Sequence, residues 1–331
     1  MRSWPQSYGA RARLRDFPVH LTGTAVQELP CSMRVSAGCE ADRILFDSGL
    51  VRVGAFRCHP DDPLFHDSGP ARNCCFVFPR TAVEIQHEHQ RAFVANPNVV
   101  TFYNQGQAYL RNAVSIEGDR CDWFGLEIDV VQDVMQSFDP AFDTHPERPF
   151  RFTRGWADAS TYLSQRHLFE QVVTGVAKEP LMVEEMVVSL LDQVVRSASK
   201  TQKRTRPNIV GPKQLDIIHH IEFVLSRQWG ECLSLRDLAH EVGISVYHLC
   251  RLFRRATGST LHQYRQKLRV RWSLESVMES NRSLVDIALD AGFSSHSHYT
   301  SSFRQEFSRT PSNVRSGKPA ESTLYQRARF W

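Results

Sequence analysis

Short apolar stretches separated by glycine, proline, asparagine and aspartate fill the chain from residue 31 to about residue 127. Examples are RILFD, VRVGAFRC, NCCFVFP, VVTFYNQG and DWFGLEI. Short strands at such spacing, bounded by turn-forming residues, are typical of an antiparallel β-sandwich or barrel. The pattern therefore predicts a β-rich domain in this part of the chain.

The period of the apolar residues changes after residue 128. DVVQDVMQSF, ASTYLSQRHLFEQVVTG and LMVEEMVVSLLDQVVRSAS repeat apolar residues at three- and four-residue steps, which predicts helices. The apolar faces of the last two either cover the β-rich domain or pair with a second subunit. The polar stretch SKTQKRTRPNIVGP follows, and its prolines and glycine predict an interdomain linker.

One pattern is written twice between Leu235 and Arg315. The first copy begins LRDLAHEVGIS and the second LVDIALDAGFS, and the next apolar run places Phe253 and Phe303 at matching positions. Each copy predicts two short helices joined by a tight turn, because a glycine at the corner tolerates unusual backbone angles. The serines after the turn, Ser245 in copy one and Ser294 or Ser295 in copy two, are suited to cap the second helix.

This duplication resembles the DNA-binding domain of the AraC/XylS family of bacterial transcription regulators. The motif A-x-x-x-G-[IF]-S in duplicate, with F-R-x-x-x-x-x-[TP] after each copy, covers residues 212 to 316, about a third of the chain. The resemblance implies two helix-turn-helix units joined by a long helix. It also implies a cupin-like jelly roll that binds a small effector and forms a homodimer.

The expected fold class is α+β with two domains: a β-rich, cupin-like jelly roll with flanking helices, then an all-α double helix-turn-helix domain. We divide the chain into a mobile arm (1–28), an effector-binding and dimerisation domain (29–198), a linker (199–211), the DNA-binding domain (212–316) and a tail (317–331). Charge supports this division. Residues 1–199 hold 19 Lys and Arg against 25 Asp and Glu, whereas residues 200–331 hold 21 against 11, so the basic part is the part expected to contact phosphates.

Base contacts to double-stranded promoter DNA are assigned from the family pattern and helical spacing. They are Tyr247, Arg251, His296, Ser297 and Ser301. A guanidinium can donate two hydrogen bonds to guanine, so Arg251 is the principal candidate, while Tyr247 has packing as its alternative. Phosphate contacts are assigned to His248, Arg254, Arg255, Thr300 and Arg304.

A long helix between the two copies sets their spacing. Residues 260–279 predict a helix about 30 Å long, close to the roughly 34 Å of one DNA turn, which would place both recognition helices in successive major grooves. The sequence departs from the family where Leu261 replaces a usual proline, present as Pro311 in copy two. Ser301 also replaces a longer polar or basic residue, which suggests that the second unit mainly positions the protein.

Aromatic residues in the β-rich domain are candidates for an apolar or aromatic effector pocket, with core packing as the alternative. They are Phe76, Phe78, Phe93, Phe102, Tyr109 and Trp123. His87 and His89 form an H-x-H without the glutamate of metal-binding cupins, so we predict no metal and no cofactor. Cys74 and Cys75 should point to opposite faces of a strand, which favours packing over redox chemistry.

The function expected is a sequence-specific transcription regulator, an effector-responsive activator whose DNA affinity or RNA polymerase contact changes with the ligand. The alternatives are a cupin-type metal enzyme, a cysteine-based DNA-repair protein, for which Cys31 lacks the neighbouring histidine, and a non-specific nucleoid protein. The sequence shows neither an apolar run long enough to span a membrane nor a leader-like start, which predicts a cytoplasmic protein. Eight cysteines without C-x-x-C spacing predict neither disulfides nor a zinc site.

Overall fold

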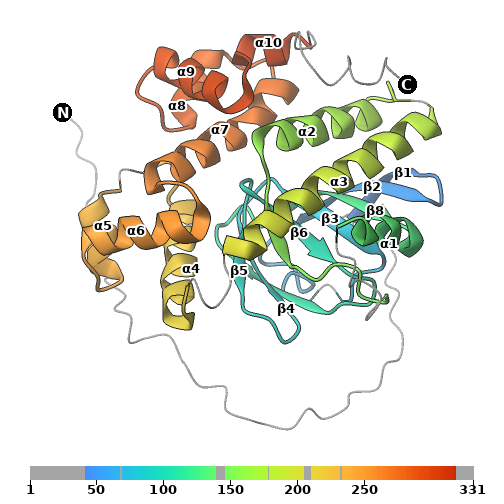
Figure 1. Ribbon diagram of the computed structural model, residues 1–331. Helices are drawn as coiled ribbons and strands as arrows, with labels where there is room; N and C mark the ends of the chain where they lie inside the picture. The colour runs from blue at the N-terminus through green and yellow to red at the C-terminus, as the bar shows by residue number, and fades with distance from the viewer. Residues whose placement is uncertain are drawn as a thin grey trace. The chain divides into compact units, whose positions relative to one another are not determined.

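A computed structural model describes residues 42–67, 69–138, 146–177, 179–204, 210–231 and 233–317. The arm predicted for residues 1–28 lies outside the described residues, as do Cys31, the linker residues 205–209 and the tail after residue 317. All the described residues belong to one compact body. Figure 1 shows its β-rich part and its helical part.

Two antiparallel sheets form the β-rich domain. The larger sheet has the strand order β1 (Asp42–Asp47), β2 (Val51–Cys58), β8 (Asp119–Leu126), β3 (Cys74–Pro79), β6 (Val99–Tyr103) and β9 (Arg154–Trp156). The smaller sheet has the order β5 (Phe93–Ala95), β4 (Val83–His87) and β7 (Tyr109–Ala113). The pairs β4–β5 and β4–β7 are nested inside β3–β6 and β3–β8, the arrangement of a double-sheet jelly roll.

Strand alternation gives the larger sheet two apolar faces. Cys74, Phe76 and Phe78 of β3 point into a core shared with the helices, whereas Cys75 and Val77 point toward the smaller sheet. The helices over the outer face are α1 (Ile128–Gln136), α2 (Ala159–Val173) and α3 (Pro180–Arg204). The apolar faces of α2 and α3 therefore cover the sheet, as in the first of the two alternatives above.

In the described part of the chain after residue 210, the structure has seven helices. They are α4 (Pro212–Arg227), α5 (Leu235–Glu241), α6 (Val246–Thr257), α7 (Leu261–Glu279), α8 (Leu284–Asp290), α9 (His296–Phe307) and α10 (Pro311–Arg315). We call α4–α6 the first unit and α8–α10 the second unit, and α7 links them (Figure 1). Thr260 caps α7 and Thr310 caps α10 at matching positions of the repeat, so the Leu261 and Pro311 difference leaves both helix starts intact.

The two units differ in how their apolar cores are connected. The core of the first unit is a separate cluster that ends on α7 at Leu268. Val270, Leu274 and Val277 of α7 belong instead to the core of the second unit, and that core is continuous with the one beneath the larger sheet. Helix α3 also extends to Arg204, so the first residues of the predicted linker are helical.

Candidate DNA interface and interdomain pocket

Matching turns precede α6 and α9, the two helices predicted to recognise DNA. Gly243 (φ 68°) and Gly292 (φ 75°) occupy the left-handed region that favours glycine. Ser245 Oγ accepts a hydrogen bond from the backbone N–H of His248 at 3.2 Å, and Ser295 does the same for His298 at 3.2 Å. Serine caps therefore start both recognition helices, and Ser295, not Ser294, is the cap of the second.

The first recognition helix, α6, has a buried stripe and an exposed stripe. Leu249, Leu252 and Phe253 are buried, whereas Tyr247 is 69% exposed. The Arg251 guanidinium lies 5.5 Å from the Tyr247 ring centroid and donates a 3.4 Å hydrogen bond to the Tyr247 hydroxyl. Tyr247 thus packs on Arg251 instead of in the core, and it restrains the side chain proposed to read guanine. His248, Arg254 and Arg255 are exposed on the same helix.

The second recognition helix, α9, has the same division with smaller outward side chains. Tyr299, Phe303 and Phe307 are buried. The residues predicted to face DNA are His296, Ser297, Thr300, Ser301 and Arg304. All are exposed except Thr300, which is half-buried. His296 Nε2 and Thr300 Oγ1 lie 3.5 Å apart. The DNA contacts assigned to all these residues remain predictions.

A buried ionic network joins α7 to the β-rich domain and α2. Asp122 of β8 accepts hydrogen bonds from Arg80 Nε at 2.8 Å and from Arg166 Nη1 of α2 at 2.6 Å. Arg166 also pairs with Glu279 of α7, and Arg80 Nη1 lies 3.3 Å from the same carboxylate. Burial alone would lower the pKa of Arg166, but the carboxylates of Asp122 and Glu279 raise it above its ordinary value.

Glu275 extends this network to the next turn of α7. It pairs with Arg120, and its Oε2 lies 3.7 Å from Arg80 Nη1. Burial acts to raise the pKa of Glu275, yet the guanidinium groups of Arg120 and Arg80 hold it below its ordinary value. This acid is therefore charged in the folded protein at neutral pH.

Arg271 connects α7 to both the β-rich domain and the second recognition helix. Its side chain is buried, and Nη1 donates to the carbonyls of Pro97 at 2.9 Å and Ala157 at 3.0 Å. Its Nε donates to Glu306 of α9 at 2.8 Å. The Tyr162 ring lies beneath the guanidinium at 5.0 Å. The position of α9 is thus tied to the β-rich domain through one side chain.

The first unit contacts the β-rich domain through α4, and α6 also packs against α3. Its three ion pairs are Arg91–Asp216 at 2.6 Å, Glu84–His219 at 3.0 Å and Arg154–Glu222 at 3.0 Å. Asn96 adds neutral hydrogen bonds to Ser226 Oγ at 2.9 Å and to the Tyr264 hydroxyl at 2.8 Å. Hydrogen bonds from His219, and then from Asn112, outweigh burial and lower the pKa of Glu84.

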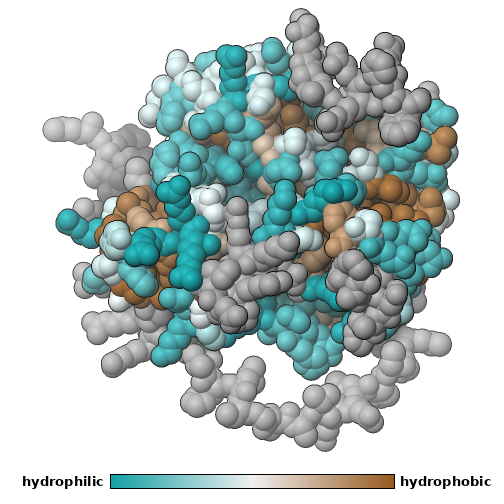
Figure 2. Space-filling view, in the orientation of Figure 1, coloured by the Kyte–Doolittle hydropathy of each residue, from teal (hydrophilic) through white to brown (hydrophobic). Residues whose placement is uncertain are grey.

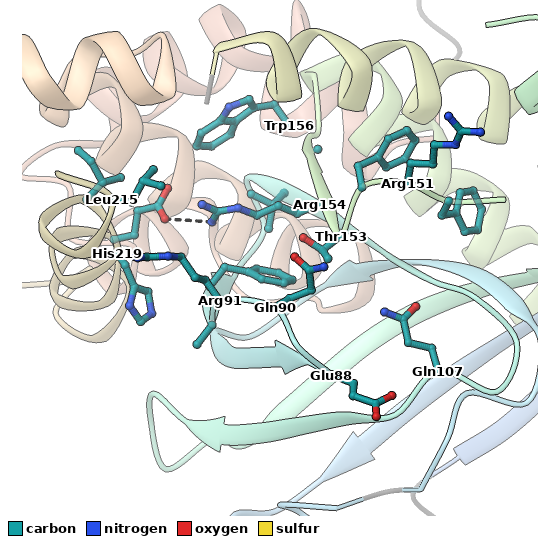
Figure 3. A pocket seen from close by; sticks show the side chains of 18 of the residues that line it. Glu88, Gln90, Arg91, Gln107, Arg151, Thr153, Arg154, Trp156, Leu215 and His219 are labelled. Atoms are coloured by element: carbon teal, nitrogen blue, oxygen red, sulfur yellow. Dashed lines mark hydrogen bonds and ion pairs between the residues drawn. The ribbon is translucent and has the colours of Figure 1, made fainter. Parts of the chain in front are cut away.

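A pocket of about 1230 Å³ opens between the β-rich domain and the first unit. Apolar side chains from both sides line it: Phe93, Val99, Phe150, Phe152, Trp156, Leu215, Ile218 and Ala256. Figure 3 shows Arg154 projecting between the two sides, with its ion pair to Glu222 drawn as a dashed line. The Arg154 guanidinium also stacks over the Phe93 ring at 5.2 Å.

Of the six aromatic residues assigned to an effector pocket, Phe93 lines this one. Phe76, Phe78 and Phe102 are buried in the core shared with the helices, so they face away from the space between the sheets. Tyr109 and Trp123 pack on the side of the larger sheet that faces the smaller one. Strand alternation is the reason: adjacent residues of one strand, such as Phe102 and Tyr103, belong to different cores.

The H-x-H histidines do not converge. His87 is buried among aromatic rings, with Nδ1 3.0 Å from Gln107 Nε2, and burial lowers its pKa to about 4. His89 is exposed with φ 59° and pairs with Glu88. Among the residues that the structure describes, no three His, Cys, Asp or Glu side chains are grouped to hold a metal ion. Cys74 and Cys75 lie on opposite faces of β3, as predicted.

Sequence reasoning missed the interdomain residues Arg80, Asp122, Arg166, Glu222 and Arg271. One signal was present: Arg271 and Glu275 lie on the same stripe of α7 as Tyr264 and Leu268, which is otherwise a core position. Charged residues at core positions require buried partners, and the partners of Arg271 and Glu275 in the β-rich domain lie more than a hundred positions away. No helix in the described part of the chain has the length and apolar character of a membrane span.

Comparison with known proteins identifies the class of protein to which this chain belongs. A family model described as a helix-turn-helix domain matches residues 238–317. The probable transcription factor PqrA of Proteus vulgaris is 36% identical over 100 residues, which are 30% of this chain and 80% of that protein. The regulatory protein SoxS of Salmonella typhimurium is 35% identical over 83 residues, or 25% of this chain and 78% of that protein.

Among solved structures, an AraC-type transcriptional regulator from Chromobacterium violaceum is 31% identical. It covers 34% of this chain and 96% of its own, with a TM-score of 0.28. The helix-turn-helix pair and its relatives define a DNA-binding transcription regulator. The chain belongs to the AraC/XylS family of transcription regulators.

Proposed function

We propose that the protein is an effector-responsive transcription activator that reads two successive major grooves of promoter DNA. The observation that carries this proposal is the pair of outward recognition helices joined by α7, a helix of 19 residues. Arg251 and Tyr247 read bases, with His296, Ser297 and Ser301, while His248, Arg254, Arg255, Thr300 and Arg304 hold phosphates. The protein acts in the cytoplasm, where promoter DNA and RNA polymerase are found.

The test is a selection from randomised DNA followed by binding measurements across salt concentration. A sequence-specific regulator is expected to enrich a site with two half-sites one helical turn apart and to bind it about a thousandfold or more tighter than random DNA. Removing one phosphate-contacting arginine should flatten the salt dependence by about one unit of slope. A specificity ratio near one would instead identify a non-specific nucleoid protein.

The interdomain pocket is the proposed effector site, and its occupant is a small molecule with an apolar or aromatic body. The charged lining residues include two mutually paired sets, Arg91 with Asp216 and Arg154 with Glu222, so the lining favours no net charge in the ligand. A thermal-shift screen of uncharged and zwitterionic aromatic compounds tests this. The replacement Leu215→Trp, which narrows the pocket, should abolish the shift, while Leu110→Trp on an exposed strand should preserve it. A shift retained by Leu215→Trp would place the ligand elsewhere.

A homodimer formed through the β-rich domain completes the proposal. Figure 2 shows hydrophobic side chains gathered over β1 and β2, where Ile44 is 53% exposed and Leu50 is 40% exposed on the edge strand and its turn. An exposed apolar edge strand is a template for pairing with another chain. Sedimentation of Ile44→Lys against the parent protein tests it: the variant should be monomeric, and an unchanged dimer would exclude this edge.

A further inference from the structure

The two helix-turn-helix units differ in their relation to the interdomain pocket. Every pocket-lining residue beyond residue 156 belongs to the first unit: Leu215, Asp216, Ile218, His219, Glu222, Ala256 and Thr257. The last two lie at the end of the recognition helix α6. None of the lining residues in the described chain comes from α8, α9 or α10. A molecule in the pocket therefore touches the first recognition helix directly and not the second.

Ala256 and Glu306 occupy the same position of the repeat but have different contacts. Ala256, buried on α6, lines the pocket. Its counterpart on α9 is Glu306, which accepts hydrogen bonds from Arg271, and Arg271 is bound to the carbonyls of Pro97 and Ala157. One recognition helix ends at a pocket, and the other ends on a buried ion pair that anchors it to the β-rich domain.

The strength of attachment follows the same division. The second unit shares its apolar core with the β-rich domain. Arg271 of α7 forms a pair with Glu306 of α9 in which both side chains are buried, and it donates to the carbonyls of Pro97 and Ala157. The first unit has its own core. It contacts the β-rich domain through Phe223 of α4, through packing of α6 against α3, and through the ion pairs of α4, which have at least one partner exposed by a fifth or more. Ion pairs that are partly exposed contribute little, whereas breaking a buried pair is costly.

The carboxyl end of α4 is held against α7. Arg269 of α7 donates to the carbonyl of Trp229 at 2.8 Å, just beyond the end of α4, and the Trp229 and Trp272 rings lie 4.9 Å apart. The pocket residues of α4 lie toward its other end, where Gly211 precedes the helix. A displacement at the pocket thus turns α4 about a fixed carboxyl end.

We propose that the pocket controls the first helix-turn-helix unit alone, while the second unit stays fixed to the β-rich domain as an anchor on DNA. Arg154 is the residue that transmits occupancy, because it lies in the pocket, stacks on Phe93 and holds the buried carboxylate of Glu222 on α4. A ligand that displaces Arg154 from Glu222 releases α4, and with it the orientation of α6. The role of a ligand in this inference rests on the proposed effector site. Its mechanical part, the control of α4 and α6 by the Arg154–Glu222 pair, does not.

The mechanical part is tested without any ligand, by hydrogen exchange of the full chain. The double variant Arg154→Gln with Glu222→Gln removes both charges, so no charge is left unpaired. It is expected to raise amide exchange in α4 and α6 about tenfold while α8 and α9 change by less than about twofold. The matched control Arg282→Gln with Asp290→Asn, an exposed pair within the second unit, should change neither. Equal acceleration of both units by the first double variant overturns the proposal.

DNA binding provides the second readout. Two probes are used, each keeping only one half-site, and the half-site read by α6 is the one weakened by Arg251→Ala. The pocket-narrowing Leu215→Trp should change affinity for the α6 half-site by about fivefold or more and for the other by less than about twofold. Equal changes at both half-sites overturn selective control. Because neither experiment uses a ligand, a failed effector screen leaves both results interpretable.

Discussion

The two helix-turn-helix units have nearly the same local structure and different surroundings. Both use a glycine at the turn, a serine cap and a buried phenylalanine, Phe253 or Phe303, at the same position of the repeat. The first borders a pocket and has its own core, whereas the second shares the core of the β-rich domain. The two copies therefore share the local structure of the recognition helices and differ in the contacts that surround them.

The largest expected effect tests the anchorage. Glu306→Gln leaves the buried guanidinium of Arg271 without its charge partner in the second unit, so the free energy of unfolding should fall by about 3–5 kcal/mol. Chemical denaturation measures it. Arg91→Ala, which breaks the exposed pair with Asp216 on the first unit, should cost about 1 kcal/mol or less. Comparable losses would mean that the two attachments do not differ in strength.

Acid is expected to weaken the same region. Burial, then Arg309 of the second unit and Arg166, lower the pKa of His167 on α2 from 6.5 to about 4. The unfolded chain therefore binds a proton that the folded chain excludes, and the free energy of unfolding decreases as pH falls through this window, by up to about 3 kcal/mol. His167→Gln should flatten the curve, and the exposed His262→Gln should leave it as it is. If His167→Gln leaves the pH dependence of the free energy of unfolding unchanged, His167 is not responsible for the loss of stability in acid.

A smaller effect tests which unit reads bases. Arg251→Ala should lose about 1–3 kcal/mol of discrimination at one base pair, because a bidentate contact to guanine is removed. Ser301→Ala should alter sequence preference little. A randomised-site selection with each variant gives both answers, and equal losses would show that the second unit specifies bases as strongly as the first.

The smallest effect lies at the end of the recognition helices. Gly258 caps α6 in the left-handed conformation with φ 76°, and its counterpart Ser308 adopts φ 56° at the end of α9. A serine is strained there, so Ser308→Gly should raise the free energy of unfolding by about 0.5–1 kcal/mol. The reverse change, Gly258→Ser, should lower it by a similar amount. Thermal unfolding of both variants checks the pair.

The local pattern predicted most of the helical part. Apolar positions that recur every three or four residues predicted α6, α7 and α9, and glycine and serine predicted the turns and caps. These features depend on neighbours three or four residues away. The β-rich domain was predicted as a class but not in detail. Which face of a strand meets which core depends on pairing partners far along the chain, and Phe76 and Phe102 were placed in a pocket for that reason.

By itself, the sequence determined the duplicated DNA-reading element, because its turns, serine caps and buried stripes depend on residues a few positions apart. Only the tertiary structure decided that the two copies are unequal. The contacts that make them so, Arg166 with Glu279 and Pro97 with Arg271, join positions 113 and 174 residues apart. Buried charges need partners wherever the fold supplies them, and no local pattern shows which residues those will be.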